Sequence, residues 1–193
     1  MFRPLGHSDC SMLLNNLAVC LSNRYNQLRA VEDLNGAIAL DRDALALRPL
    51  GHPDRSMSLN NLAADLSTRY EQFGAREDLN EAIILDRDAL MLRPPGHPLR
   101  SRSLNNLAVR LSTRYHQLGM VEDVNEAIVL ARDALALRPL GHPDRSSSLN
   151  NLGGYLGIRF TRSSQSKELF SRYTQLAHPP SMASSSDLAA TRA

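Results

Sequence analysis

Residues 59–63 read Leu-Asn-Asn-Leu-Ala, and the same five residues recur at 14–18 and at 104–108, 45 positions away in each direction. Arg-Pro pairs keep this spacing and begin at Arg3, Arg48, Arg93 and Arg138. The segments 48–92 and 93–137 are identical at 32 positions without a gap. A fixed period of about 20 to 50 residues is the signature of a repeat protein. The chain therefore divides into units 3–47, 48–92 and 93–137 and a partial unit, 138–160.

Each unit is predicted to contain two helices. In the second unit, apolar residues recur every three or four positions along two stretches that are separated near Gly74. This spacing places them on one face of an amphipathic helix and argues against strands. Ser56 and Ser58 are expected to cap the first helix. Arg93-Pro94 is expected to end the second, because proline cannot donate the next helical hydrogen bond.

A single helical hairpin cannot bury the apolar faces of both its helices, so neighbouring hairpins must stack. The predicted fold class is therefore all-α, an α-solenoid of stacked helical hairpins. Its concave face would be lined by the first helix of each unit.

Composition excludes several classes of function. The 193 residues carry a net charge of +2, and the acidic residues are spread through every unit, so the basic stripe of a nucleic-acid binder is missing. The single lysine, Lys167, lies outside the full units, which excludes lysine-dependent active sites from them. No catalytic triad stands out. We therefore expect no enzyme activity, no cofactor and no bound metal.

Apolar runs and cysteines in the sequence indicate the cellular compartment. No segment approaches an uninterrupted apolar run of about 18 residues, so no membrane span is expected. Cys10 and Cys20 occur in the first unit alone and are not a repeated framework. Sparse, unrepeated cysteines favour free thiols in a reducing, cytoplasmic setting.

The units resemble tetratricopeptide repeats (TPRs). The family motif is matched at its small and apolar positions by Leu59, Leu62, Ala63, Leu66, Ala82, Ala89 and Pro94. Asp86 departs from it, because a large aromatic residue is usual there. The 45-residue unit also exceeds the family's length of about 34 residues, as in the long units of kinesin light chains and of large fungal TPR arrays. The resemblance implies a right-handed TPR-like superhelix over residues 3–160.

TPR arrays bind peptides or partner helices in the concave groove, so the resemblance implies a non-enzymatic protein–protein interaction scaffold. The groove positions carried over from the family include Asn15, Asn60, Asn105 and Asn150, which the units share, and Met57, Arg102, Asp65 and Arg110, where the units differ. A ladder of amides can pair with an extended peptide backbone. With equal weight, the asparagines instead bond neighbouring helices and fix the stacking.

Other signals favour structural roles. His52-Pro53-Asp54 matches the tripeptide of J-domain cochaperones, but it recurs with the unit and is predicted to be a turn. The histidines of successive units should lie too far apart to share a metal. The charged run Asp86-Arg87-Asp88 is predicted to be a solvated face or an ion pair between units, and Tyr70 to be a core residue.

The fourth unit departs from the pattern after Leu152. Residues 161–177 are predicted to form a diverged capping helix, and residues 178–193 a disordered tail. An uncapped first helix would expose an apolar edge and favour self-association or marginal stability. An alternative function follows: the chain is a sensing, autoinhibitory or truncated repeat segment of a larger fungal signalling ATPase or CHAT-type protease, without a ligand of its own.

Overall fold

The computed structural model describes residues 7–177, which form helices only. The predictions for Arg3 and for a disordered tail at 178–193 lie outside these residues. The helices are α1 (His7–Leu28), α2 (Val31–Ala46), α3 (Arg55–Phe73), α4 (Arg76–Met91), α5 (Arg100–Leu118), α6 (Val121–Ala136) and α7 (Arg145–Ala177).

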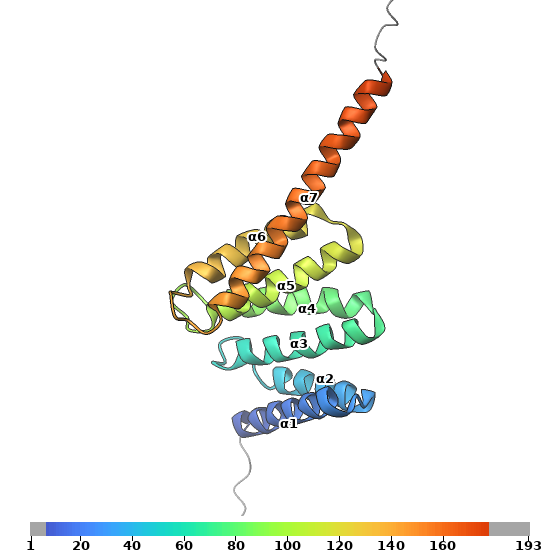
Figure 1. Ribbon diagram of the computed structural model, residues 1–193. Helices are drawn as coiled ribbons and strands as arrows, with labels where there is room; N and C mark the ends of the chain where they lie inside the picture. The colour runs from blue at the N-terminus through green and yellow to red at the C-terminus, as the bar shows by residue number, and fades with distance from the viewer. Residues whose placement is uncertain (1–6, 178–193) are drawn as a thin grey trace, which may run out of the picture. The chain divides into compact units, whose positions relative to one another are not determined.

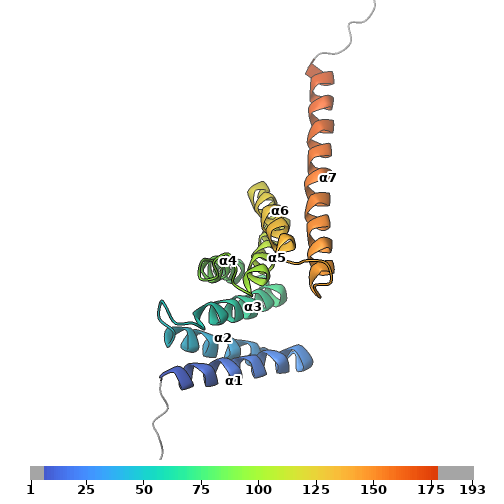
Figure 2. The same ribbon diagram turned by 90° about the vertical axis from the view of Figure 1, so that its left-hand side faces the viewer.

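Helices α1 to α6 pack as three successive hairpins. Each odd-numbered helix packs against the even-numbered helix that follows it, and α2 and α4 also pack against the first helix of the next hairpin. The two views in Figures 1 and 2 show these hairpins following one another in chain order. The all-α prediction and the prediction of paired helices are therefore confirmed. The chain divides into two compact units, Met1–Leu156, which holds the hairpins, and Gly157–Ala193.

The core consists of the apolar stripes that the sequence indicates. Leu62 and Leu66 of α3 are buried together with Leu34 and Ile38 of α2, so a single core cluster spans two hairpins. Tyr70 is also buried, which confirms its prediction as a core residue. Burying these side chains is favourable by about 1.5–3 kcal/mol each, so the contact between hairpins contributes substantially to stability.

Glycine ends the first helix of the second and third hairpins. Gly74 adopts a φ of +71°, and its amide donates to the carbonyl of Tyr70 at 2.7 Å. Gly119 repeats this arrangement with a φ of +69°. A left-handed residue is the usual way to close a helix, and glycine adopts this conformation without a steric penalty. The predicted break near Gly74 is thus confirmed.

The prediction that serines cap the first helix is wrong. Helix α3 begins at Arg55, and no side-chain hydrogen bond caps it. Ser56 and Ser58 lie one and three residues inside the helix and are buried. Their hydroxyls instead accept hydrogen bonds from arginines that follow the second helices.

Helix α7 runs without interruption through residues 145–177, so the segment 161–177 continues it and is not a separate helix. Within the described residues, the fourth unit has no second helix to pair with its first. Leu149 is accordingly 47% exposed, whereas its counterparts Leu59 and Leu104 are 2% exposed. Glycine also replaces the buried alanine of the other units at position 153, where a Cβ would meet no atom within 4 Å.

Two glycine substitutions should act in opposite directions. Gly153→Ala should stabilise α7 by about 0.5–1 kcal/mol, because glycine is a poor helix former and the site has room for a methyl group. Gly74→Ala should destabilise the chain by about 1–2 kcal/mol, because its left-handed conformation strains any residue with a Cβ. Urea denaturation of both variants measures the difference, and a Gly74→Ala variant as stable as the parent would contradict this account.

Candidate functional site

Three arginines lie buried between successive hairpins, and they are the arginines of the Arg-Pro pairs. Arg48, Arg93 and Arg138 each follow the second helix of a hairpin, and their exposed fractions are 1%, 2% and 3%. We call them the inter-unit arginines. A guanidinium has five N–H donors and no acceptor, so its burial requires several oxygens around it.

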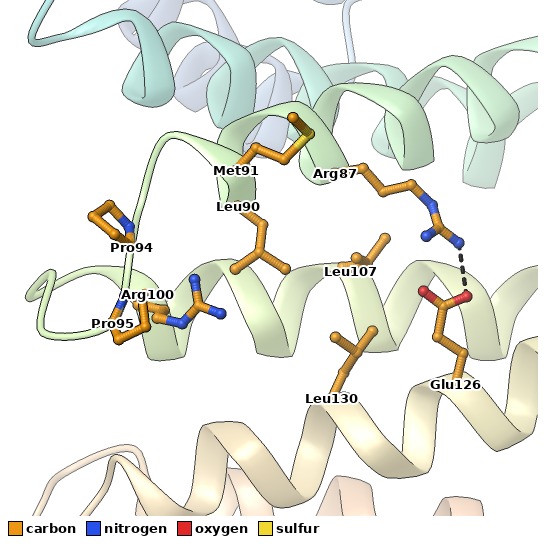
Figure 3. A pocket seen from close by; sticks show the side chains of 9 residues that line it. All are labelled: Arg87, Leu90, Met91, Pro94, Pro95, Arg100, Leu107, Glu126 and Leu130. Atoms are coloured by element: carbon orange, nitrogen blue, oxygen red, sulfur yellow. Dashed lines mark hydrogen bonds and ion pairs between the residues drawn. The ribbon is translucent and has the colours of Figure 1, made fainter.

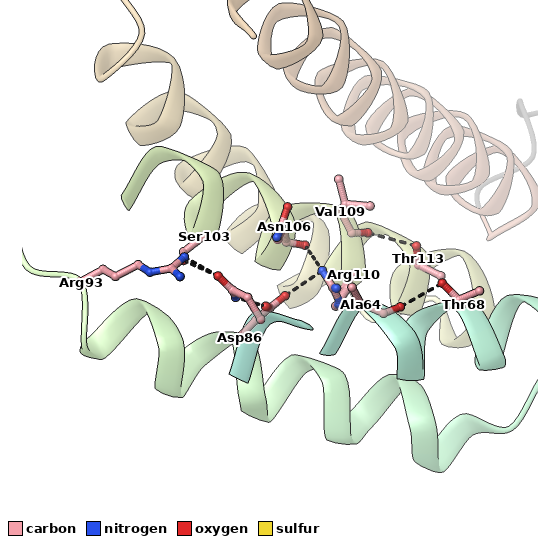
Figure 4. A network of polar contacts seen from close by, with 10 residues as sticks. Ala64, Thr68, Asp86, Arg93, Ser103, Asn106, Val109, Arg110 and Thr113 are labelled. Atoms are coloured by element: carbon pink, nitrogen blue, oxygen red, sulfur yellow. Dashed lines mark hydrogen bonds and ion pairs between the residues drawn. The ribbon is translucent and has the colours of Figure 1, made fainter. Parts of the chain in front are cut away.

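Arg93 shows how these donors are used (Figure 4). Its Nε donates to Ser56 Oγ at 3.1 Å, and its Nη2 donates to the Ser56 carbonyl at 3.1 Å. Its Nη1 donates to Ser103 Oγ at 2.6 Å and also to Asn60 Oδ1. Ser56 and Asn60 belong to α3, whereas Ser103 belongs to α5. One side chain therefore ties together the first helices of two consecutive units.

The same arrangement recurs with the 45-residue period. Arg48 Nε donates to Ser11 Oγ at 3.1 Å and its Nη1 to Ser58 Oγ at 2.7 Å. Arg138 donates to Ser101 Oγ at 3.4 Å and to Ser148 Oγ. The Arg-Pro pairs were predicted only to end helices, so the bonding of each arginine to two first helices was not predicted. The recurrence of two serines at fixed positions in α3, α5 and α7 was the available signal.

A second set of contacts closes each hairpin. Arg69 of α3 donates through Nε and Nη2 to the two carboxylate oxygens of Asp78 on α4, at 2.7 Å each. Arg114 and Asp123 form the same bidentate pair in the third hairpin. Arg69 also donates to the Asn35 amide oxygen of the preceding unit at 3.2 Å. The bidentate pairs join the two helices of a hairpin, and the bond from Arg69 to Asn35 also joins the second hairpin to the first.

Ion pairs also join successive second helices, as the charged runs predicted. Arg42 of α2 lies 2.8 Å from a carboxylate oxygen of Glu81 on α4, and Arg87 of α4 lies 2.7 Å from one of Glu126 on α6. Their side chains are largely solvated, so each pair contributes little to stability.

Asp86, by contrast, is a buried member of the same charged run. Its Oδ2 lies 2.8 Å from Arg110 Nη1 of α5, and its Oδ1 accepts a hydrogen bond from Asn60 Nδ2 at 2.7 Å (Figure 4). Burial raises the pKa of Asp86 to about 6, although Arg110 and Asn60 both favour its charged form. Loss of the partner arginine would leave a carboxylate in an apolar interface.

The predicted groove residues fall into two groups. Buried side chains that bond to neighbouring helices or face the contact between units are Asn15, Asn60, Asp65 and Arg110. Half-buried or exposed side chains are Asn105, Asn150, Met57 and Arg102. Asn105 Oδ1 accepts a hydrogen bond from Asn151 Nδ2 at 3.2 Å. These contacts favour the internal interpretation for Asn15, Asn60 and Asn105 and engage Asp65 and Arg110 with neighbouring helices, while groove binding by Asn150, Met57 and Arg102 stays a prediction.

Helices α1, α3 and α5 nevertheless expose side chains in a regular order. Residues at one register position are Val19, Ala64 and Val109, and those at another are Met12, Met57 and Arg102. Asn16, Asn61 and Asn106 lie between these two rows in the sequence. We call these nine residues the first-helix face. It combines exposed apolar side chains with amides, and Arg102 is its one charge.

A pocket of about 570 Å³ lies among α4, α5 and α6 (Figure 3). Leu90, Leu107 and Leu130 contribute one apolar side chain from each of these helices. The Arg87–Glu126 ion pair lies on its border, and the Pro94-Pro95 turn borders it elsewhere. Its volume falls within the usual range for small-molecule sites, about 300–1,000 Å³, but it offers few buried polar groups to fix a ligand.

Comparison with known proteins yields no family: the chain matches no protein-family model, and no curated protein matches it. Within the described part of the chain, no helix is long and apolar enough to cross a membrane. Among the same residues, no group of three or more histidine, cysteine or acidic side chains is placed to hold a metal ion.

Removal of an inter-unit arginine should destabilise the array strongly. Arg93→Ala would remove the arginine donor from Ser56 and Ser103 and leave Asn60 Oδ1 with the Ser103 hydroxyl alone, and we expect a loss of about 3 kcal/mol in the free energy of unfolding. Arg87→Ala removes a solvated ion pair and should cost less than about 1 kcal/mol. Urea denaturation followed by circular dichroism checks both values, and equal losses would show that Arg93 is not a main tie between units.

Proposed function

We propose that the chain is a non-enzymatic scaffold that binds an extended peptide or a partner helix along the first-helix face, as the groove of a TPR-type α-solenoid does. The observation that supports this most is the regular exposure of apolar side chains on that face. Val19, Met57 and Val109 are each about 40% exposed, although they lie on helices whose other faces are packed. Exposed apolar residues in a continuous row are typical of interaction surfaces.

The amide row gives this face a second property that suits a peptide. Asn16, Asn61 and Asn106 are exposed or half-buried, and each amide has both donors and acceptors. A peptide backbone has the same alternation, so it can pair with such a row whatever its side chains are. Met57 and Arg102 occupy the same register position in successive units, so they would select among partners by apolar contact and by charge.

The inter-unit arginines support this function indirectly. Because Arg48, Arg93 and Arg138 fix the distance from each first helix to the next, the exposed rows keep their spacing without a ligand. A preorganised surface loses less conformational entropy on binding than a mobile one. The scaffold would therefore bind without first having to order itself.

Two valines give a matched test of the binding face. Val109 lies on first helix α5 and is 40% exposed, whereas Val129 lies on second helix α6 and is 55% exposed. Peptides selected from a random display library on the parent chain should bind Val109→Arg at least about tenfold more weakly, because a charge would be placed within the apolar contact. They should bind Val129→Arg with unchanged affinity, as measured by fluorescence polarisation.

Each outcome of this experiment has a clear meaning. Loss of binding on Val129→Arg alone would move the site to the second helices, where the pocket in Figure 3 lies. Failure to select any peptide, together with capture of longer TPR-type chains from cells, would support the alternative of a repeat segment within a larger signalling ATPase or protease.

A specific observation also favours self-association through α1. Leu17 is 51% exposed, whereas its counterparts Leu62 and Leu107 are covered by α2 and α4 and are at most 2% exposed. Leu13 is equally exposed and stands where the other units carry a buried serine. Leu13 and Leu17 therefore form an apolar strip at the positions where the first helices of the later hairpins contact the preceding hairpin.

Light scattering of the purified chain tests this second proposal. We expect a mass above that of one chain that rises with concentration and falls to one chain in Leu17→Asp, because the charge would have to be buried. Leu50→Asp is the control, since Leu50 is 83% exposed and lies in a turn. A parent chain that stays monomeric at high concentration would contradict the proposal.

A further inference from the structure

Two positions that lie 24 residues apart in the sequence recur in consecutive units, the first on a second helix and the other on the next first helix. In chain order the pairs are Asp41 with Asp65, Asp86 with Arg110, and Ala131 with Tyr155. The second pair matches opposite charges in a 2.8 Å ion pair. The third combines a small and a large side chain, both buried. The first pair places two buried carboxyl groups at these positions on the packed helices α2 and α3, where the charge of Asp65 acts on Asp41.

The surroundings of this first pair do not supply the missing cation. Asp41 of α2 is 1% exposed, and within the described residues neither of its carboxylate oxygens has a hydrogen-bond partner. Asp65 of α3 is 8% exposed and accepts a hydrogen bond from the Ser22 hydroxyl of α1 at 2.7 Å. Arg48, which follows α2, acts electrostatically on Asp41, but its guanidinium donates to two serines.

Two carboxylates that are close together and out of water cannot both be ionised without a large cost in free energy. In the next interface the protein avoids this cost by placing Arg110 opposite Asp86. We propose that Asp41 and Asp65 share one proton, and that the contact between the first two units loosens when this proton is lost. The proton offsets the negative charge of the pair, as the Arg110 guanidinium does for Asp86 in the next interface.

The acid–base properties of the pair agree with this assignment. Burial, together with the negative charge of Asp65, raises the pKa of Asp41 from 3.8 to about 7 against the opposing effect of Arg48. Burial likewise raises the pKa of Asp65 to about 6, against the hydrogen bond from Ser22. Because both folded-state values exceed the unfolded value, the folded chain holds more protons between about pH 4 and pH 7. The stability that this pair contributes is therefore fully present below about pH 4 and is lost as the pH rises from there to about 7.

The titration of individual carboxyl groups tests the shared proton directly. With ¹³C-labelled aspartate, the carboxyl carbons of Asp41 and Asp65 should titrate in two steps, at least one of them above pH 5.5, and Asp41→Asn and Asp65→Asn assign the signals. In Asp65→Arg the pKa of Asp41 should fall by at least about one unit, because the variant recreates the pair of Asp86 and Arg110. Titration of both groups near pH 4 in the parent chain would overturn the proposal.

Thermal unfolding then tests the consequence for the interface. Between pH 5.5 and pH 8.5 the Tm of the parent chain should fall, and this fall should be smaller in Asp65→Arg and larger in Arg110→Asp, which creates a second acid pair. Asp43→Asn is the matched control, since Asp43 lies on the same helix as Asp41 but is exposed, and it should leave the dependence unchanged.

If Asp65→Arg does not fold, the double variant Asp41→Ala with Asp65→Tyr, which copies the third pair, takes its place. An unchanged pH dependence in these variants would overturn the proposal. The inference concerns contact between units and does not depend on peptide binding.

Discussion

The structure depends on a repeated constraint: a buried guanidinium that must find hydrogen-bond acceptors on two helices at once. Each inter-unit arginine follows a second helix and reaches one serine on the first helix of the preceding unit and another on the first helix of its own unit. Since an unpaired buried guanidinium is very costly, the two first helices cannot slide relative to each other without losing these bonds. Apolar burial makes the hairpins stack, and the arginine sets where they stack.

This constraint also explains why the serines and asparagines that bond to these arginines recur in the first helices, with Leu13 of the first unit as the exception. Ser56, Asn60 and Ser103 bond to one arginine, so a change in any of them would leave a donor unpaired. Residues that recur within a repeat are easily interpreted as ligand contacts, because a ligand that follows the array would meet each of them. Here the hydrogen bonds show that part of the recurrence serves the array itself. Asn16, Asn61 and Asn106 lie in the row that we assign to the proposed function, although Asn61 Nδ2 also donates to Asn15 Oδ1 of the preceding unit at 3.3 Å.

Periodicity was sufficient to predict the elements of the fold but not the contacts between them. The spacing of apolar residues and the glycine at position 74 predicted two helices per unit and the break between them, because both depend on local geometry. The role of Ser56 was predicted wrongly, since a serine near a helix start is usually a cap and its arginine partner lies 37 residues away. The burial of Asp65 and Arg110 was also missed, because charged residues are rarely buried and their surroundings come from neighbouring units.

The positions that differ between units carry information of another kind. Asp65, Arg110 and Tyr155 occupy one register position and would pass for determinants of ligand selectivity if each were considered alone. Considered together with the residue 24 positions earlier, two of the three form matched pairs, of opposite charge or of complementary size. Where a residue varies together with its neighbour across an interface, that contact constrains its identity. Where a residue varies independently on an exposed face, as Met57 and Arg102 do, a binding partner is the constraint that we infer. The pair of Asp41 and Asp65 fits this rule only when a proton is counted as part of the interface.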